Sequence, residues 1–285
     1  MQYINAASSS EALAALLKAD GRGMVIAGGT DVIVDMKNGK IHPELLIDVT
    51  RAADMQGIRV EDDKLVIGAA ATLTQIARHE AVRRFYPSLA KGCGTVGSLQ
   101  IRNSATLAGN VISAQPAGDG AMALAPLAPV FTVLSAAGER TMTMGEMYAG
   151  FARSAVDHSR ELVTRITVPL PGAHEAASFV RLELRKSLSL PMLNCAAMVH
   201  YEDGAVRWVR ITMAPVGVGP VRAAAAEAYL TGGPLTEEAM SRAGELALEN
   251  ANPRSNPLRG SREYRLETLP VMVRRALEEC RAQLV

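Results

Sequence analysis

The stretch TVGSLQIRNSATLAGNVISAQPAGDG, from Thr95 to Gly120, decides how the rest of the chain is interpreted. It is rich in glycine, and its only charged residues are Arg102 and Asp119. Glycine in the interior of a helix or strand costs about 0.5–1 kcal/mol relative to alanine, and an ordinary surface loop carries more charge. The composition therefore favours irregular backbone that passes close to a large or flat partner and offers it N–H groups. The alternative is a tight, buried connection between two layers.

A second, shorter glycine turn occurs earlier in the chain. The apolar run Met24–Ile26 leads into Ala27-Gly28-Gly29-Thr30-Asp31, and a short apolar segment follows. This pattern predicts a strand, a tight turn and the start of a helix, whose unpaired N–H groups attract a phosphate. The turn matches neither the G-x-G-x-x-G nor the P-loop sequence. An ordinary turn with Thr30 or Asp31 as the helix cap is therefore the alternative.

Taken together, the two stretches resemble the FAD-binding (medium) subunit of the molybdenum hydroxylases, the family of xanthine dehydrogenase and carbon monoxide dehydrogenase. The similar segments are Ala27–Val34, Gly97–Asn103, Thr106–Asn110, Pro116, Asp119 and Arg259–Ser261. Ala108 is a departure, because the family usually has glycine there. The resemblance extends almost from end to end of the chain.

This resemblance implies an α+β fold in two domains. Residues 1–172 are expected to form a two-part FAD-binding domain of the PCMH (vanillyl-alcohol-oxidase-like) type, with subdomains of about 1–55 and 56–172. Residues 173–285 are expected to form a small C-terminal domain of antiparallel sheet plus helices.

The residue pattern agrees with this division. Alternating strand and helix signals before residue 55 predict a partly parallel sheet, and Asp62-Asp63 and Ala137-Gly138 predict hairpins. Two prolines within 169–176 mark the boundary. The turn Glu202-Asp203-Gly204 predicts an antiparallel meander, after which helical patterns close the chain.

The resemblance also implies which residues bind FAD: Ile26, Ala27, Gly28, Gly29, Thr30, Asp31, Val32, Ile33, Val96, Ile101, Thr106, Leu107, Ala108, Gly109, Asn110, Asp119, Leu162, Val163 and Arg181. The first turn should hold the pyrophosphate through backbone N–H groups. Gly109 should let the second stretch approach the cofactor closely. We expect Asp119 to accept hydrogen bonds from ribose or ribityl hydroxyls, or else to cap the following helix. Asp31 is expected to point away from the phosphate, because two negative charges repel.

Two further residues are expected near the flavin. Arg181 stands where the family has lysine, and arginine differs in that it stays charged and binds as a planar fork. The family's acidic residue is missing from Arg185–Leu190. Phe151 is a possible contact on the acceptor side of the flavin, with plain loop packing as the alternative.

Composition excludes several other classes. The formal net charge of +1 does not provide the basic field of a nucleic-acid-binding protein, and no apolar run is long enough to span a membrane. The three cysteines stand far apart and the five histidines are scattered, so a metal or iron–sulfur site on this chain is not supported. Unpaired cysteines and the absence of a leader pattern favour a cytoplasmic location. No G-x-S-x-G or H-E-x-x-H motif indicates hydrolysis.

The expected function is electron transfer within an oxidoreductase complex. Molybdopterin would lie on a large partner subunit and [2Fe-2S] clusters on a small one, and electrons would pass through this chain's FAD to NAD or another acceptor. Two alternatives remain: a free-standing FAD oxidoreductase of the same superfamily, and a flavin-free assembly scaffold.

Overall fold

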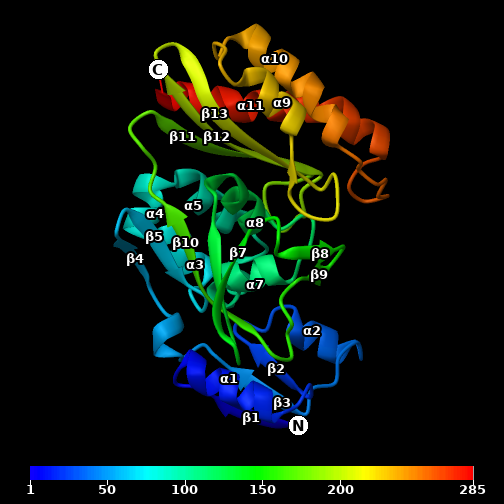
Figure 1. Ribbon diagram of the computed structural model, residues 1–285. Coiled ribbons are helices and arrows are strands. Elements are labelled where there is room, and N and C mark those ends of the chain that lie inside the picture. The colour runs from blue at the N-terminus through cyan, green and yellow to red at the C-terminus, as the bar shows by residue number, and fades with distance from the viewer. Residues whose placement is uncertain (285) are drawn as a thin grey trace.

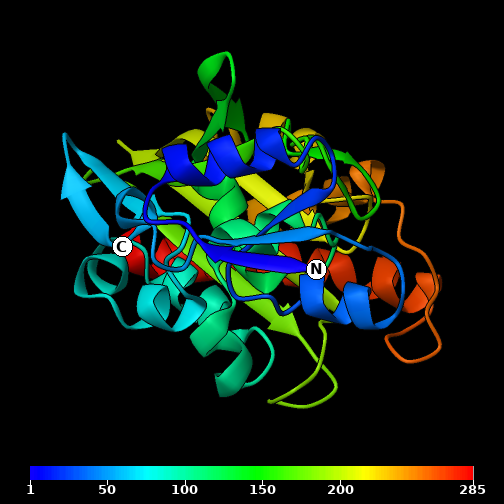
Figure 2. The ribbon, with the colours of Figure 1, turned by 90° about the horizontal axis from the view of Figure 1, so that it is seen from below.

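The structure is a computed structural model that describes residues 1–284. Its N-terminal unit is a three-stranded parallel sheet with two helices (Figures 1 and 2). Its elements are β1 (Gln2–Asn5), α1 (Ser9–Lys18), β2 (Gly23–Ile26), α2 (Val32–Lys37) and β3 (Leu45–Asp48). The strand order β1-β3-β2 makes the two crossovers run in opposite directions. Right-handed connections then place α1 and α2 on opposite faces of the sheet, as Figure 2 shows. The predicted parallel sheet is confirmed.

The middle unit is a five-stranded antiparallel sheet in the order β4-β5-β10-β6-β7. Its strands are β4 (Ile58–Glu61), β5 (Lys64–Gly68), β6 (Val130–Ser135), β7 (Gly138–Thr143) and β10 (Leu162–Pro169). Asp62 and Asp63 both have positive φ in the β4–β5 turn, at 47° and 56°, which suits a two-residue hairpin turn. Both predicted hairpins are confirmed.

Short helices and one small hairpin complete the middle unit. They are η1 (Ala53–Met55), α3 (Leu73–Arg78), α4 (Glu80–Phe85), α5 (Pro87–Thr95), α6 (Leu99–Ser104), α7 (Leu107–Ile112), α8 (Asp119–Leu124), η2 (Ala125–Leu127), β8 (Tyr148–Gly150) and β9 (Arg153–Ser154). Their apolar residues and the inner face of the five-stranded sheet form one core, which includes the fully buried Phe131 and Ile166.

The glycine-rich stretch is more helical than its composition predicts. Its glycines stand mainly at helix ends: Gly97, with φ +51°, precedes α6, and Gly118 precedes α8. Ser98 and Thr106 start α6 and α7, because each hydroxyl accepts a hydrogen bond from a backbone N–H of the first turn. Gly109 is the exception, inside α7 and exposed. The expectation of irregular backbone was wrong because hydroxyl caps outweigh the cost of glycine.

The C-terminal unit is a four-stranded antiparallel sheet with three helices (Figure 1). Its elements are β11 (Glu175–Leu182), β12 (Leu193–Glu202), β13 (Ala205–Ala214), β14 (Val221–Arg222), α9 (Ala224–Leu230), α10 (Glu237–Leu246), η3 (Ala247–Asn250) and α11 (Arg262–Leu284). The predicted meander is confirmed, and Asp203 and Gly204 form its turn with positive φ.

The four-stranded sheet is buried on both faces. Along β11, Ala177 and Phe179 join the core of the middle unit, whereas Ala176 and Val180 join the core beneath α9 to α11. Successive side chains on a strand point to opposite faces, so this alternation places the sheet between two apolar layers. The middle and C-terminal units therefore share buried surface.

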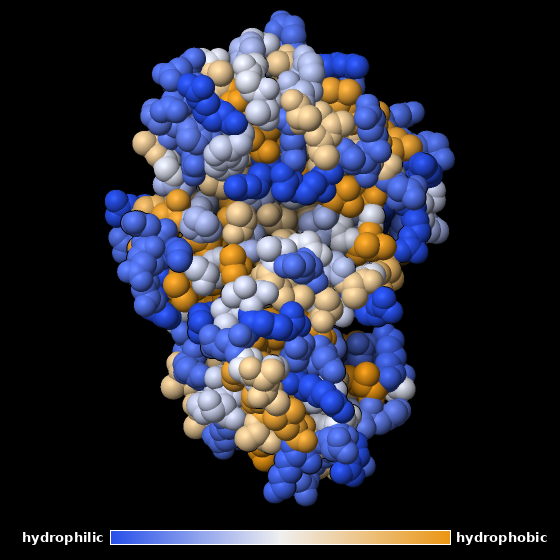
Figure 3. Space-filling model, in the orientation of Figure 1, coloured by the Kyte–Doolittle hydropathy of each residue, from blue (hydrophilic) through white to orange (hydrophobic). Residues whose placement is uncertain are grey.

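The three cysteines and the surface bear on the predictions made from composition. No helix within residues 1–284 is long and apolar enough to cross a membrane, and apolar residues are interspersed with hydrophilic ones in Figure 3. Cys93, Cys195 and Cys280 are free and buried, and burial raises the pKa of each thiol. No group of potential ligands with metal spacing occurs among the same residues.

Candidate functional site

The two glycine stretches meet in the structure. A Cβ atom added to Gly28 would lie 2.0 Å from the carbonyl oxygen of Ser104 and 2.7 Å from the backbone nitrogen of Ala105. Only glycine allows this approach of two backbones. The N–H of Leu73 donates to the carbonyl of Ala105 over 2.8 Å and fixes the second stretch from its other side. The two glycine stretches, far apart in the sequence, are thus in direct backbone contact in the structure.

The first turn leads from β2 into α2. Gly29 has φ +67°, and its carbonyl accepts from the N–H of Ile33 over 3.0 Å. Asp31 occupies the cap position of α2 without a capping hydrogen bond from its side chain. Asp31 is among the residues that line the large cavity described below, and its orientation relative to a phosphate stays a prediction. Partial desolvation there and the nearby Asp35 raise the pKa of this carboxyl.

The second stretch is held by its own side chains. Thr106 is only 3% exposed, and its hydroxyl accepts from the N–H of Gly109 over 3.0 Å. The side-chain oxygen of Asn110 accepts from the N–H of Ala121 over 3.0 Å and so joins α7 to α8. Gly118 packs against the same amide, where a Cβ would lie 3.1 Å from the Asn110 oxygen. Because it donates to the Thr106 hydroxyl, the N–H of Gly109 already has a hydrogen-bond partner within the chain.

A buried polar network joins the middle and C-terminal units. Asp119 is 5% exposed, and one carboxylate oxygen accepts from Nε of Arg181 over 3.0 Å, the other from Nδ2 of Asn194 over 2.9 Å. Burial raises the pKa of Asp119, and Arg181 and Asn194 oppose that rise. Asp119 is the first residue of α8 after Gly118 and makes no capping bond. The alternative of a helix cap was therefore wrong.

Arg181 is tied into this network on several sides. Its side chain is 7% exposed, and its guanidinium also pairs with Glu183 and donates to the carbonyl of Ser189. An acidic partner is thus present, although the sequence shows none in Arg185–Leu190. Two carboxylates more than balance the charge of this arginine, which acts as a bridge between the units.

A cavity of about 690 Å³ lies between the middle and C-terminal units. Its lining comprises Asp31, Val96, Gly97, Asn110, Ser113, Gln115, Pro116, Ala117, Gly118, Asp119, Phe151, Ser189, Leu190, Pro215, Gly217, Val218, Asn252, Arg254, Ser255, Asn256, Arg259 and Arg265. The predicted site residues among them are Asp31, Val96, Asn110, Asp119 and Phe151. Both glycine stretches and the Asp119 network therefore border one space, of the size usual for cofactor pockets, roughly 300–1,000 Å³.

Phe151 is an exposed aromatic residue at the edge of this cavity. It follows β8 at the tip of the small β8–β9 hairpin, and Arg254 of the C-terminal unit stacks over its ring at 4.5 Å from the centroid. A cation above an aromatic face is attracted by the ring quadrupole. The contact thus joins the two units across the cavity.

Other predicted residues do not line the cavity. Leu162 and Val163 on β10 are buried in the apolar core. Outside the lining are also Ile26, Ala27, Gly28, Gly29, Thr30, Val32, Ile33, Ile101, Thr106, Leu107, Ala108, Gly109 and Arg181. The contact between Gly28 and Ser104 keeps the two motifs together beside it. Their direct contacts with a cofactor stay predictions.

Sequence reasoning missed several residues of the site. Asn194 is a buried polar residue within the apolar run Leu193–Val199, and that interruption is a signal available from sequence. The arginines at 254, 259 and 265 come from a segment rich in Asn, Pro, Ser and Arg. Their spacing gives no indication that they reach a cavity bordered by Asp31 and Asn110.

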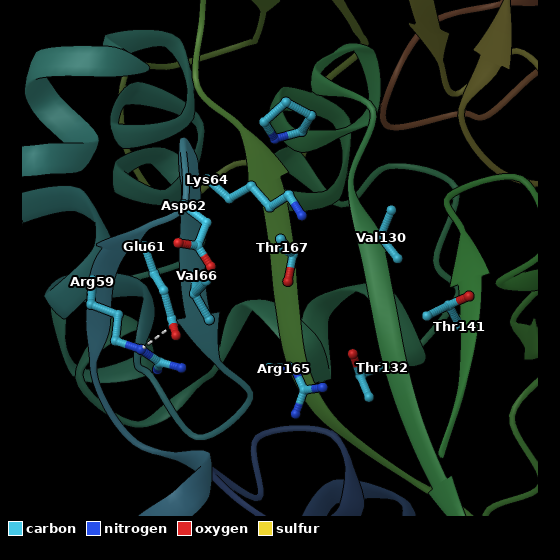
Figure 4. A pocket seen from close by; sticks show the side chains of 11 residues that line it. Arg59, Glu61, Asp62, Lys64, Val66, Val130, Thr132, Thr141, Arg165 and Thr167 are labelled. Atoms are coloured by element: carbon cyan, nitrogen blue, oxygen red, sulfur yellow. Dashed lines mark hydrogen bonds and ion pairs between the residues drawn. The ribbon is translucent and has the colours of Figure 1, made fainter.

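A second hollow, of about 580 Å³, lies on the outer face of the five-stranded sheet (Figure 4). It contains the ion pair between Arg59 and Glu61 at 2.8 Å, and Thr132 and Thr141 face each other across neighbouring strands. No residue that the sequence analysis assigned to FAD lines it. It is the polar outer surface of the sheet and lies apart from the motifs.

Comparison with known proteins gives the family. Residues 1–171 match the family described as FAD binding domain in molybdopterin dehydrogenase, and residues 178–280 match the CO dehydrogenase flavoprotein C-terminal domain. The chain belongs to this family of FAD-binding oxidoreductase subunits, so the predicted family, fold class and cofactor are confirmed.

Individual relatives agree with this assignment. The nicotinate dehydrogenase FAD-subunit of Eubacterium barkeri is 34% identical over 219 residues, which cover 76% of this chain and 74% of the relative. The xanthine dehydrogenase FAD-binding subunit of Escherichia coli O157:H7 is 26% identical and covers 97% and 94%. A solved carbon monoxide dehydrogenase from Hydrogenophaga pseudoflava superposes with a TM-score of 0.94 at 27% identity, over 100% of this chain and 98% of that one.

The residues present fit FAD. The cavity is large enough for an extended, partly apolar ligand and is bordered by groups of both kinds: Val96, Leu190 and Val218 are apolar, whereas Asn110 and Arg259 are polar. Buried Arg265 reaches the same space and has no carboxylate partner within residues 1–284. Such a donor set suits a ligand with a flat ring and phosphate groups.

Proposed function

We propose that this chain is the electron-transfer subunit of a molybdenum hydroxylase complex. The observation that carries the proposal is the cavity between the two units, which both glycine stretches border in a chain of the FAD-binding family. FAD, when bound, takes up electrons from one partner and passes them to another. The chain itself supplies binding, orientation and electrostatics.

The residues have separate tasks in this proposal. The Ala27–Ile33 turn and the Thr106–Asn110 segment hold the phosphate and sugar portions, supported by the close packing of Gly28 on Ser104. Asp119 borders the cavity, and its ion pair with Arg181 behind the lining fixes the C-terminal unit against the site. Phe151 covers one edge. Asp119 and Arg181 are themselves buried, which strengthens the polar contact between them.

We further propose that the chain works with two partners and an external acceptor. The relatives support this: one is a carbon monoxide dehydrogenase medium chain, and the solved enzyme of Hydrogenophaga pseudoflava is described as a form that lacks the Mo-pyranopterin moiety of its molybdenum cofactor. Molybdopterin would belong to a large subunit and [2Fe-2S] clusters to a small one. NAD, or another soluble oxidant, would receive the electrons. Three buried free thiols suit the reducing cytoplasm.

The division into domains of residues 1–172 and 173–285 is also a proposal. Two observations support it: a distinct second core lies beneath α9 to α11, and β10 ends at Pro169 with Pro171 in the connection that follows. The subdivision near residue 55 rests on the change from the parallel to the antiparallel sheet.

The test uses the purified chain alone and then with its partners. We expect flavin absorbance near about 450 nm and release of FAD rather than FMN on heating. Oxidation of a reduced dye or nicotinamide should occur with the chain alone, whereas substrate hydroxylation should need the molybdenum and iron–sulfur subunits. Hydroxylation by the single chain would favour the free-standing oxidoreductase, and a chain without flavin would favour the scaffold.

A further inference from the structure

Three arginines line one end of the cavity. Arg254 and Arg259 come from the loop before α11, and Arg265 comes from the first turn of that helix. Arg265 is 4% exposed, and its guanidinium donates to the carbonyls of Arg259 and Pro215 over 3.1–3.4 Å. In residues 1–284, no ion pair joins any of the three to a carboxylate. We call these residues the arginine end.

A buried guanidinium without a counter-charge is unfavourable. Removing a charge from water costs several kcal/mol unless an opposite charge or a full set of hydrogen bonds replaces the water. The other charged residues of the cavity lining are Asp31 and Asp119, and Asp119 is already engaged by Arg181 and Asn194. Burial and, to a lesser extent, the neighbouring Arg259 lower the pKa of Arg265. An anion in the cavity would supply the missing counter-charge.

The arginine end is held in shape before any ligand binds. The N–H of Asn256 donates to the carbonyl of Gly260 over 3.0 Å, and the N–H of Leu258 donates to the Asn256 side chain over 2.9 Å. Ser255 accepts from the N–H of Arg262 over 2.9 Å and fixes the loop to the start of α11. Stacking on Phe151 holds Arg254 across the cavity. Such preorganisation reduces the entropy lost on binding.

We propose that Arg254, Arg259 and Arg265 form an anion subsite that binds a phosphate group of a nucleotide. Planar guanidinium groups match phosphate oxygens in charge and geometry. Asn252, Ser255 and Asn256 line the same end and offer uncharged polar groups. The proposal deepens the proposed function, because the phosphate belongs either to FAD itself or to a soluble nucleotide that accepts electrons from it.

The experiment compares the wild-type chain with Arg259→Gln, because Arg259 is half-buried and less central to packing than Arg265. In one arm, ADP is titrated into the FAD-loaded chain by calorimetry. In the other, FAD is titrated into the flavin-stripped chain. Loss of a charge-assisted hydrogen bond should weaken binding by about tenfold or more. Arg275→Gln is the matched control, since Arg275 is exposed on α11 and lies outside the cavity lining.

Each outcome decides the proposal. Weaker ADP binding with unchanged flavin content supports a soluble nucleotide as the source of the phosphate, and weaker FAD binding without ADP binding supports the cofactor's own phosphate. Unchanged affinities in both arms overturn the subsite. An equal loss in Arg275→Gln also overturns it, because the effect would then come from net charge. A third outcome separates the two proposals. If the wild-type chain shows no flavin absorbance but binds ADP, and Arg259→Gln weakens that binding, the subsite is supported and the proposed function is refuted.

Discussion

The contact between Gly28 and Ser104 makes a sharp test of how the two glycine stretches work together. In Gly28→Ala, the new methyl carbon would lie 2.0 Å from the Ser104 carbonyl oxygen, 2.4 Å from its carbon and 2.7 Å from the nitrogen of Ala105. All three atoms belong to the backbone, so no side-chain rotation relieves the clash. Ordinary contact begins near 3.4 Å, and the two segments must therefore separate by about 1.4 Å.

Both stability and cofactor binding should respond. Forcing an extra methyl group into close packing costs about 1–3 kcal/mol, which lowers the Tm of a chain of this size by roughly 2–4 °C per kcal/mol. Because the shift lies between the two segments that we propose hold FAD, we expect flavin content to fall well below one per chain. Purified protein is assayed by absorbance for flavin content, by fluorescence titration for FAD affinity, and by thermal unfolding.

The matched control is Gly94→Ala in α5. A Cβ at Gly94 meets nothing within 4 Å, so the same change of residue type adds no clash there. We expect wild-type flavin content and equal or higher stability in this variant. Gly28→Ala with full flavin content and unchanged FAD affinity would refute the idea that packing of the two stretches organises the site.

Three further changes test other parts of the site. Gly109→Val should abolish flavin loading in soluble protein, because a β-branched side chain blocks the exposed face of α7; normal flavin stoichiometry would contradict this. Arg181→Lys should change the flavin midpoint potential and Tm less than Arg181→Ala, which leaves Asp119 buried without its cation at a cost of about 3–5 kcal/mol; equal changes would show that charge is irrelevant. The contact with Arg140 lowers the pKa of Glu161 in the folded protein. The ion pair therefore stabilises the folded state at neutral pH, and this stabilisation is lost as the pH falls through the lowered pKa. Glu161→Gln should therefore lower the unfolding free energy at pH 7, by about 0.2–1 kcal/mol, and not in strong acid, as denaturant titration at both pH values would show.

Local features of the fold could be predicted from sequence. The turn at Asp203-Gly204 was predicted because such residues adopt positive φ readily, and the structure confirms it. The parallel N-terminal sheet followed from alternating strand and helix signals. The helices of the glycine-rich stretch were missed because composition hides the effect of a single hydroxyl cap such as Thr106.

The walls of the cavity could be predicted only in part. Asn110 and Asp119 belong to a motif within one segment, so a family pattern identifies them. Arg254 meets Phe151 only after two units have packed together, and no local periodicity encodes a contact over such a separation. Asn194 lies between these cases: a polar residue in an apolar strand indicates a buried partner, but the identity of that partner depends on the fold.

The sheet buried on both faces sets the order in which the site is completed during synthesis. The glycine stretches leave the ribosome first, but the β11–β12 layer that covers the middle unit, with Phe179 and Met198, follows much later. Arg265 arrives later still, in the first turn of the last helix. Until β11 and β12 are made, the nascent chain thus exposes the apolar face of the middle unit that they cover, and it has only part of the cavity lining until α11 begins. Cofactor capture in a completed cavity therefore comes after that apolar face has been covered.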